Sequence, residues 1–147
     1  DSWKIHSRTL VPMTPEEARK AASIIDAKVL SNRKPPYPIA GGLFDALEDA
    51  GGDIFKVTND ELHHWQKIFL ELEGIDIHNA AAVAVASLVQ AVENGIVGKE
   101  DVIMLNITGA GEERAKSEGE IYYANPHLVI DPSLPEEEII NMVEKLF

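Results

Sequence analysis

The sequence predicts an α/β fold of three layers, in which helices flank a mostly parallel sheet. Two observations lead to this prediction. Short apolar segments that suit buried strands alternate with longer segments whose apolar residues recur at helical spacing. Glycine, proline or a helix-capping pattern separates most of these segments. The 147 residues correspond to one ordinary domain, or to a piece of a larger one.

The composition excludes several classes of function. The chain has 13 basic residues against 25 acidic ones, which gives a formal net charge of −12. So acidic a chain repels nucleic-acid phosphates and anionic membrane surfaces, and we expect neither as a partner. Cysteine is absent, which excludes disulfides and thiolate metal sites and fits a reducing compartment such as the cytoplasm. No apolar stretch is long enough to cross a bilayer.

Capping patterns and helical spacing predict five helices. Thr14 and Thr58 are each followed three residues later by glutamate, which is the capping-box pattern. The helix over 80–92 is apolar almost all round, so we expect it to be buried on most sides. The last helix is expected to be capped at 133–136, with buried apolar residues. The predicted helices cover residues 15–25, 39–50, 58–73, 80–92 and 134–147.

Five further segments are predicted as strands: residues 27–31, 53–57, 101–107, 121–123 and 128–130. The segment 101–107 is mostly apolar, with charge before it and glycine after it, as expected of a buried strand. It ends in Thr108-Gly109-Ala110-Gly111. Ligands of open α/β sheets bind at the carboxyl ends of strands, which makes this turn the first candidate for a small-molecule site. The same short pattern also fits an ordinary turn.

Three other positions are candidates for a functional role. Asn32-Arg33-Lys34 follows a predicted strand in a proline-stiffened loop, and two cations there could hold a phosphate or sulfonate; the alternative is a solvated loop. The carboxylate of Glu73 lies at a helix end, where it opposes the helix dipole, although a solvated glutamate also fits. His63 and His64 point about 100° apart on a helix, and the other histidines lack ligand-spaced companions, so we predict no metal site.

Several of these segments together resemble a known family. The residues 73–77 (Glu-Gly-Ile-Asp-Ile), the alanine-rich helix that follows them and the segment 102–111 resemble the C-terminal third of threonine-synthase-like enzymes. These are fold-type II pyridoxal 5′-phosphate (PLP) enzymes with a tryptophan synthase β-like fold. Residues 29–37, 41–47 and 105–109 resemble the archaeal cysteate synthase branch of this family most particularly.

The resemblance implies a reaction. In the cysteate synthase branch, sulfite replaces the phosphate of O-phospho-L-serine and gives L-cysteate for coenzyme M biosynthesis. The cofactor ring acts as the electron sink. A threonine synthase, which converts O-phosphohomoserine to threonine, is the alternative within the family. The resemblance also implies a cytoplasmic homo-oligomer that acts on small molecules.

The resemblance further implies roles for particular residues. Thr108 matches the threonine beside the pyridine nitrogen, and Gly109 and Gly111 would let the backbone approach the ring. Asn106 and Glu73 are assigned to the cofactor site as well. Asn32 and Arg33 match a loop that we expect to help hold the phosphate or sulfite.

No catalytic residue is predicted within these 147 residues. In the family the Schiff-base lysine and the glycine-rich phosphate loop precede this region, and none of the nine lysines here fits the lysine motif. The chain is therefore predicted to be a C-terminal segment that is inactive without the N-terminal part of its own protein. Two other classes stay open from the residues alone: an α/β domain that binds a small anion without chemistry, and an interaction module that uses the helix over 80–92.

Overall fold

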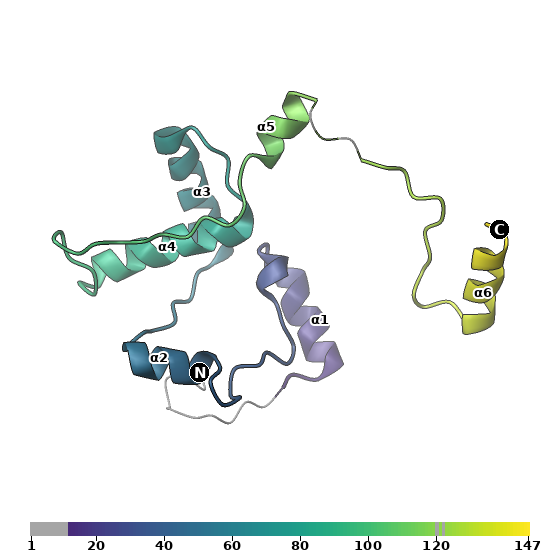
Figure 1. The fold of residues 1–147 in the computed structure, drawn as a ribbon, viewed down its shortest axis with the longest axis horizontal. Helices are drawn as coiled ribbons and strands as arrows, with labels where there is room; N and C mark the ends of the chain where they lie inside the picture. The colour runs from purple at the N-terminus through teal and green to yellow at the C-terminus, as the bar shows by residue number, and fades with distance from the viewer. Residues whose placement is uncertain (1–11, 120, 122) are drawn as a thin grey trace. The chain divides into compact units, whose positions relative to one another are not determined.

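The computed structural model describes residues 12–119, 121 and 123–147, and their regular structure is helical. The chain divides into two compact units, Asp1–Arg114 and Ala115–Phe147, which are described separately. In chain order the elements are α1 (Pro15–Ile24), the short 3₁₀ turn η1 (Lys28–Leu30), α2 (Leu43–Ala50), α3 (Asn59–Glu73), α4 (Asn79–Glu93), α5 (Glu112–Ser117) and α6 (Glu136–Glu144) (Figure 1).

Local signals place the helix ends. The capping boxes predicted at Thr14 and Thr58 are both confirmed, with each threonine hydroxyl accepting from the backbone N–H three residues later. Gly51 and Gly74 end α2 and α3 in the left-handed conformation, at φ 63° and 70°. Glycine adopts this conformation without the steric cost that a Cβ adds. The predicted start of α2 at residue 39 is wrong, because residues 39–42 form a turn before the helix begins.

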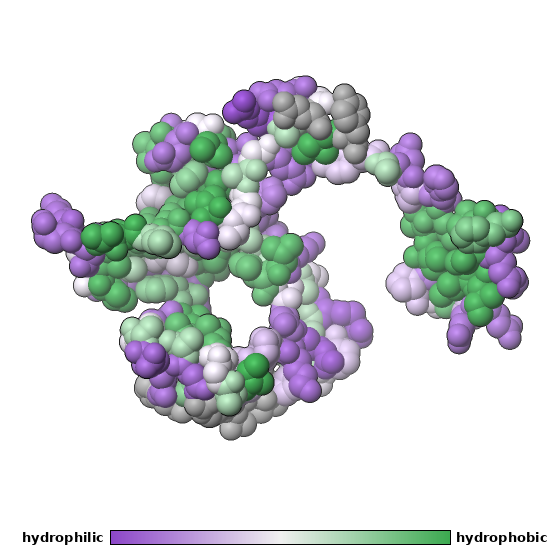
Figure 2. Space-filling model, viewed as in Figure 1, coloured by the Kyte–Doolittle hydropathy of each residue, from purple (hydrophilic) through white to green (hydrophobic). Residues whose placement is uncertain are grey.

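The core of the first unit lies between α3 and α4, which pack against each other. Every residue from 79 to 91 is buried or half-buried, which confirms the prediction for this helix. Figure 2 shows hydrophobic residues gathered over α4. The buried members of the cluster are Ala27, Leu62, Ile77, Ala81, Ala82 and Val85.

The predicted strands are not formed within the described part of the chain. Residues 28–30 form the turn η1 instead, and the described residues of the other four segments lack strand pairing. An apolar pattern favours a strand, but a strand exists only when a neighbouring strand accepts and donates its backbone hydrogen bonds. Such a neighbour is absent among the described residues, where the one recorded pairing is an isolated antiparallel bridge between Ile77 and Ala110. The three-layer fold therefore stays a prediction.

The segment 101–107 is nevertheless extended and two-faced. Leu105 and Ile107 are half-buried and pack against the core. The trace of this segment runs along α4 in Figure 1. Val102 and Met104, which alternate with them, are fully exposed or nearly so, at 102% and 95%. Alternation with a period of two is the side-chain pattern of a strand. This segment has the shape of a strand without a partner, and it leads directly into Thr108.

The second unit contains α6. The expected helix is present, but the predicted cap at Ser133 is wrong, since its hydroxyl donates to Asp131 and Pro135 precedes the helix. The predicted burial is wrong as well: α6 has no buried residue, because the described residues of this unit leave much of its apolar side exposed. The exposed apolar residues are Ile140 and Val143 in α6, and Leu146 and Phe147 after it. A membrane-spanning helix, with the length and apolarity this requires, is not found among the described residues.

Candidate functional site

The turn that carries Thr108 is bound to the α3–α4 connection, residues 74–78. The His78 N–H donates to the Gly109 carbonyl at 2.9 Å, and the Gly111 N–H donates to the Asp76 carbonyl at 2.8 Å. Gly111 has a φ of 78°, a conformation that favours glycine. These two backbone bonds hold the turn against the N-terminal end of α4.

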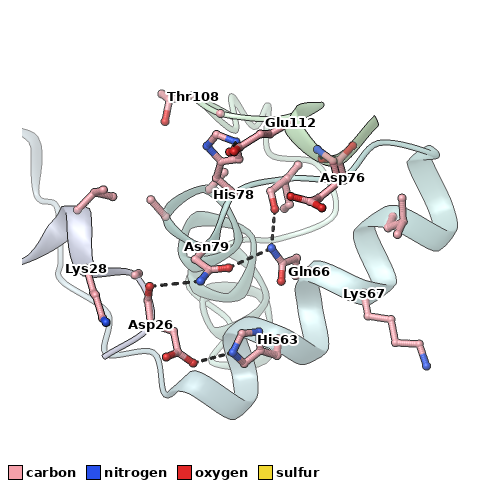
Figure 3. Close-up of a pocket in the computed structure, with 18 residues that line it drawn as sticks. Asp26, Lys28, His63, Gln66, Lys67, Asp76, His78, Asn79, Thr108 and Glu112 are labelled. Atoms are coloured by element: carbon pink, nitrogen blue, oxygen red, sulfur yellow. Dashed lines mark hydrogen bonds and ion pairs between the residues drawn. The ribbon is translucent and has the colours of Figure 1, made fainter. Parts of the chain in front are cut away.

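Side chains also link the turn and the start of α5 to the α3–α4 connection, and we call this contact region the junction. The Asp76 carboxylate accepts from the Glu113 N–H at 3.0 Å. The Nε2 atom of His78 lies 3.1 Å from a carboxylate oxygen of Glu112, and Figure 3 shows these two side chains beside Thr108. A Cβ at Gly109 would lie 2.6 Å from Nδ1 of His78, so a larger residue there would displace the imidazole. The imidazole can keep this place only if residue 109 has no Cβ.

A cavity of about 770 Å³ opens beside the turn. This volume falls within the usual range for small-molecule sites. One wall is Thr108 and Gly109, and another is the first turn of α4. The remaining lining residues come from the loop after α1, from α3, from the α3–α4 connection and from the start of α5: Asp26, Ala27, Lys28, Val29, His63, Gln66, Lys67, Leu70, Asp76, Ile77, His78, Glu112 and Glu113.

A polar network orders the wall opposite Thr108. Nε2 of His63 lies 2.7 Å from the Asp26 carboxylate, and this hydrogen bond is the main cause that raises the pKa of His63 above its ordinary value. The Asn79 amide donates to the Asp26 carbonyl, and the Gln66 amide donates to Asn79 and to the Ile77 carbonyl. Figure 3 shows this chain of contacts across the cavity. It ties the loop after α1 to both core helices.

The charges around the cavity constrain its ligand. Its lining contains four carboxylates, two lysines and two histidines. The first turn of α4 also lines it and has no side-chain cap, so the helix dipole there favours negative charge. The four carboxylates repel a polyanion, whereas the helix dipole and the lysines attract negative charge. This mixed lining suits a polar molecule with charges of both signs better than a lone phosphate.

The residues present fit one edge of PLP. The Thr108 hydroxyl can donate to or accept from a ring nitrogen, and Gly109 lines the cavity beside it. A phosphate needs several convergent N–H or cationic donors. The described lining of this cavity offers two lysines among four carboxylates, and Figure 3 shows Lys67 extending away from the other labelled side chains. The phosphate end of the cofactor is not matched here.

The residues predicted for the site lie at different places in the structure. Thr108 and Gly109 line the cavity, and Gly111 holds the turn through its backbone. Asn106 and Glu73 are exposed and lie outside the cavity lining. Asn32 and Arg33 line a separate cavity of about 620 Å³ against α1. The structure thus brings part of the predicted cofactor set together and does not join the predicted anion loop to it.

Sequence reasoning missed the residues that build the junction. The sequence alone assigns His78 no role, because no ligand-spaced companion is found for this histidine. Its signal is its position, directly after the segment 73–77 and before an apolar helix, where it is the N-cap residue. Asp76 lies within the segment 73–77 itself. Their partners Glu112 and Glu113 lie 34 or more residues away in sequence, so spacing could not reveal the contacts.

Comparison with known proteins decides the family. The chain is 41% identical over 145 residues to the cysteate synthase of Methanocella paludicola, covering 97% of this chain and 34% of that protein. The cysteate synthase of Methanosarcina acetivorans is 40% identical over 141 residues, and that of Methanosarcina mazei is 42% identical over 134 residues. This chain belongs to the cysteate synthase family and corresponds to a segment of its members. It spans about a third of the length of these relatives.

The match confirms the cysteate synthase resemblance that the sequence motifs predicted. It does not favour the threonine synthase alternative, since the relatives named above are all cysteate synthases. No family model matches the chain, and no solved structure matches it.

Proposed function

We propose that this chain forms the Thr108 wall of the active site in a cysteate synthase. The whole enzyme would use PLP to replace the phosphate of O-phospho-L-serine with sulfite, releasing L-cysteate and inorganic phosphate. The observation that carries this proposal is the identity of about 40% to cysteate synthases across nearly the entire chain. The cavity beside Thr108 supports it, because it has the size of a small-molecule site and several of its lining residues lie in the segments that carry the resemblance.

The cofactor would supply an electron sink for negative charge at the substrate Cα. In the proposal Thr108 holds the ring nitrogen through its hydroxyl, and Gly109 and Gly111 let the backbone lie close to the ring. A neutral hydroxyl does not stabilise a protonated pyridine as a carboxylate would, and this tempered sink suits replacement chemistry. Asn106 and Glu73 are proposed to belong to the surroundings of the cofactor.

The proposal assigns the remaining parts of the site to the rest of the protein. The Schiff-base lysine and the donors for the cofactor phosphate would come from outside these 147 residues, in agreement with the carboxylate-rich lining of the cavity. Asn32 and Arg33 would help to hold the phosphate or sulfite of the reactants. The extended segment 101–107 would pair with strands of the remaining protein to build the predicted sheet. The enzyme is proposed to be a cytoplasmic homo-oligomer.

The test is turnover by the whole protein in which this chain occurs. With PLP, O-phospho-L-serine and sulfite, we expect L-cysteate and phosphate in equal amounts, measured by mass spectrometry and a phosphate assay. The same protein given O-phosphohomoserine should form little threonine. Threonine formation without L-cysteate would contradict the proposal, as would L-cysteate formation by the 147 residues alone at the rate of the whole protein.

A further inference from the structure

His78 contacts the Thr108 turn in two ways and the residue that follows the turn in a third. Its backbone N–H donates to the Gly109 carbonyl at 2.9 Å. Its imidazole fills the space beside Gly109, where an added Cβ would lie 2.6 Å from Nδ1 and 3.1 Å from Cγ. Its Nε2 lies 3.1 Å from the Glu112 carboxylate. One side chain therefore meets both the residue after Thr108 and the residue that begins α5.

These contacts orient the ring. An ionised carboxylate only accepts hydrogen bonds, so an N–H at Nε2 of His78 would be the donor to Glu112. The imidazole has a neighbour on each side, with Glu112 near Nε2 and Gly109 near Nδ1. Both side chains are substantially exposed to solvent, at 47% for His78 and 39% for Glu112. A pair this exposed contributes little to global stability, so its effect is expected to be local.

We propose that His78 is a positioning residue for the active site: together with Glu112 it fixes the Thr108–Gly111 turn and thereby the place of the Thr108 hydroxyl at the cavity. Its effect on turnover rests on the proposed function, whereas its effect on the turn does not. Gly109 is part of the same arrangement, because a residue with a Cβ at this position would displace the imidazole of His78.

The test uses the whole protein and two measurements. Hydrogen exchange at the amides of residues 78 and 111 reports on the two backbone bonds of the turn without any reaction. Turnover of O-phospho-L-serine with sulfite reports on the site. His78→Ala removes both the filling ring and the donor. His78→Gln keeps an N–H that can reach Glu112, and His127→Ala changes an exposed histidine of the other unit as the control.

We expect His78→Ala to speed exchange at these amides about tenfold and to lower kcat about tenfold, with a smaller change in KM, because the contact places a group used in the transition state. His78→Gln should stay within about threefold of the natural protein in both measurements, and His127→Ala should match it. Unchanged exchange in His78→Ala would overturn the proposal whatever the turnover. Faster exchange with unchanged turnover in an active enzyme would overturn the role in positioning.

Gly109→Ala provides an independent test. The added Cβ should displace the imidazole and speed exchange to the same extent as His78→Ala, while Gly98→Ala, where a Cβ meets only ordinary contact at 3.6 Å, should not. Because both changes break one contact, the double variant Gly109→Ala/His78→Ala should be no worse than either single variant. Fully additive effects on exchange would show that the two residues act separately and would contradict the proposal. If the protein made no L-cysteate at all, the proposed function would fail while the exchange results stood.

Discussion

The Thr108 turn and the Asn32-Arg33 loop carry the two halves of the predicted site, and they are held in different ways. The turn is bound to the α3–α4 connection by two backbone hydrogen bonds, the Asp76 carboxylate and the His78–Glu112 pair. The loop has an internal bond from the Lys34 N–H to the Asn32 amide oxygen and a longer one, at 3.3 Å, from Arg33 to the Met13 carbonyl. The turn is fixed to the core, and the loop is fixed mainly to its own surroundings.

The difference shows which part of the site this chain can specify by itself. The α3–α4 connection contains the buried Ile77 and joins two helices that carry the buried residues Leu62 and Ala81. A segment that is hydrogen-bonded to this connection is therefore held in a defined position. The loop at 32–34 has no buried residue to anchor it. In the proposed function its partners would come from elsewhere in the whole protein. Four predictions test this comparison, ordered by their expected effect on stability.

The largest effect should come from the core beneath the turn. Leu62 is 2% exposed and lies in the α3–α4 cluster. Leu62→Ala should lower the free energy of unfolding of the chain by about 2–5 kcal/mol, because it removes buried methyl groups and leaves a cavity. Urea denaturation measures this. Leu72, which is 77% exposed on the same helix, is the matched control, and Leu72→Ala should change the free energy by less than about 0.5 kcal/mol. Equal effects of the two would contradict the assigned core.

An intermediate effect is expected at the junction. Asp76→Ala removes the carboxylate that accepts from the Glu113 N–H, and should cost about 1–3 kcal/mol, as for hydrogen bonds to charged groups. The amide of Glu113 should exchange faster in this variant. Asn32→Ala is the comparison in the loop: it should free the Lys34 amide and leave the Glu113 amide unchanged. A change at Glu113 in Asn32→Ala would show that the two halves are coupled after all.

A smaller effect depends on pH. The Asp26 hydrogen bond raises the pKa of His63 above its ordinary value of 6.5. The stability from this pair is therefore fully present below pH 6.5 and is lost as the pH rises through the higher folded-state pKa. Because His63 is half-exposed, we expect a loss below about 1 kcal/mol. Urea midpoints at a series of pH values should show this decline in the natural chain and not in His63→Gln. A decline of the same size in both would exclude His63 as its source.

The smallest effect on stability is expected at the loop. Arg33 is exposed, so Arg33→Ala should change the free energy of unfolding by less than about 0.5 kcal/mol. In the whole enzyme the same variant should raise the KM for O-phospho-L-serine about tenfold, because the proposed role of the guanidinium is to hold the phosphate. Arg19→Ala, at another arginine beside the same cavity, is the control for charge alone. An unchanged KM in Arg33→Ala would remove Arg33 from the proposed site.

Sequence reasoning predicted several helix ends correctly, although the predicted start of α2 and the predicted cap of α6 were wrong. The capping boxes at Thr14 and Thr58 and the helix ends at residues 50 and 73 depend on neighbours within a few residues, and all four are present in the structure. Strands depend on partners far away in the chain. The segment 101–107 has the apolar content and the alternation of a strand, but the described residues offer it no strand to pair with.

The same distinction between local signals and distant contacts applies to the site. Thr108 and Gly109 carry a local motif, and the structure places them at a cavity. His78, Asp76 and Glu112 carry no motif of their own, because their function depends on a contact between segments more than 30 residues apart. The reason for glycine at position 109 became visible only with the imidazole beside it. Family resemblance identified the turn, and the contacts show how it is held.

The most direct test of the proposed function is the turnover of a Thr108 variant in the whole enzyme. Thr108→Val is close in shape to threonine but has no hydroxyl, whereas Thr108→Ser keeps the hydroxyl. With O-phospho-L-serine, sulfite and PLP, we predict that Thr108→Val forms L-cysteate at least about tenfold more slowly than the natural enzyme, with an unchanged unfolding midpoint, and that Thr108→Ser keeps most of the rate. A Thr108→Val enzyme that is folded and fully active would show that this hydroxyl is not part of the site.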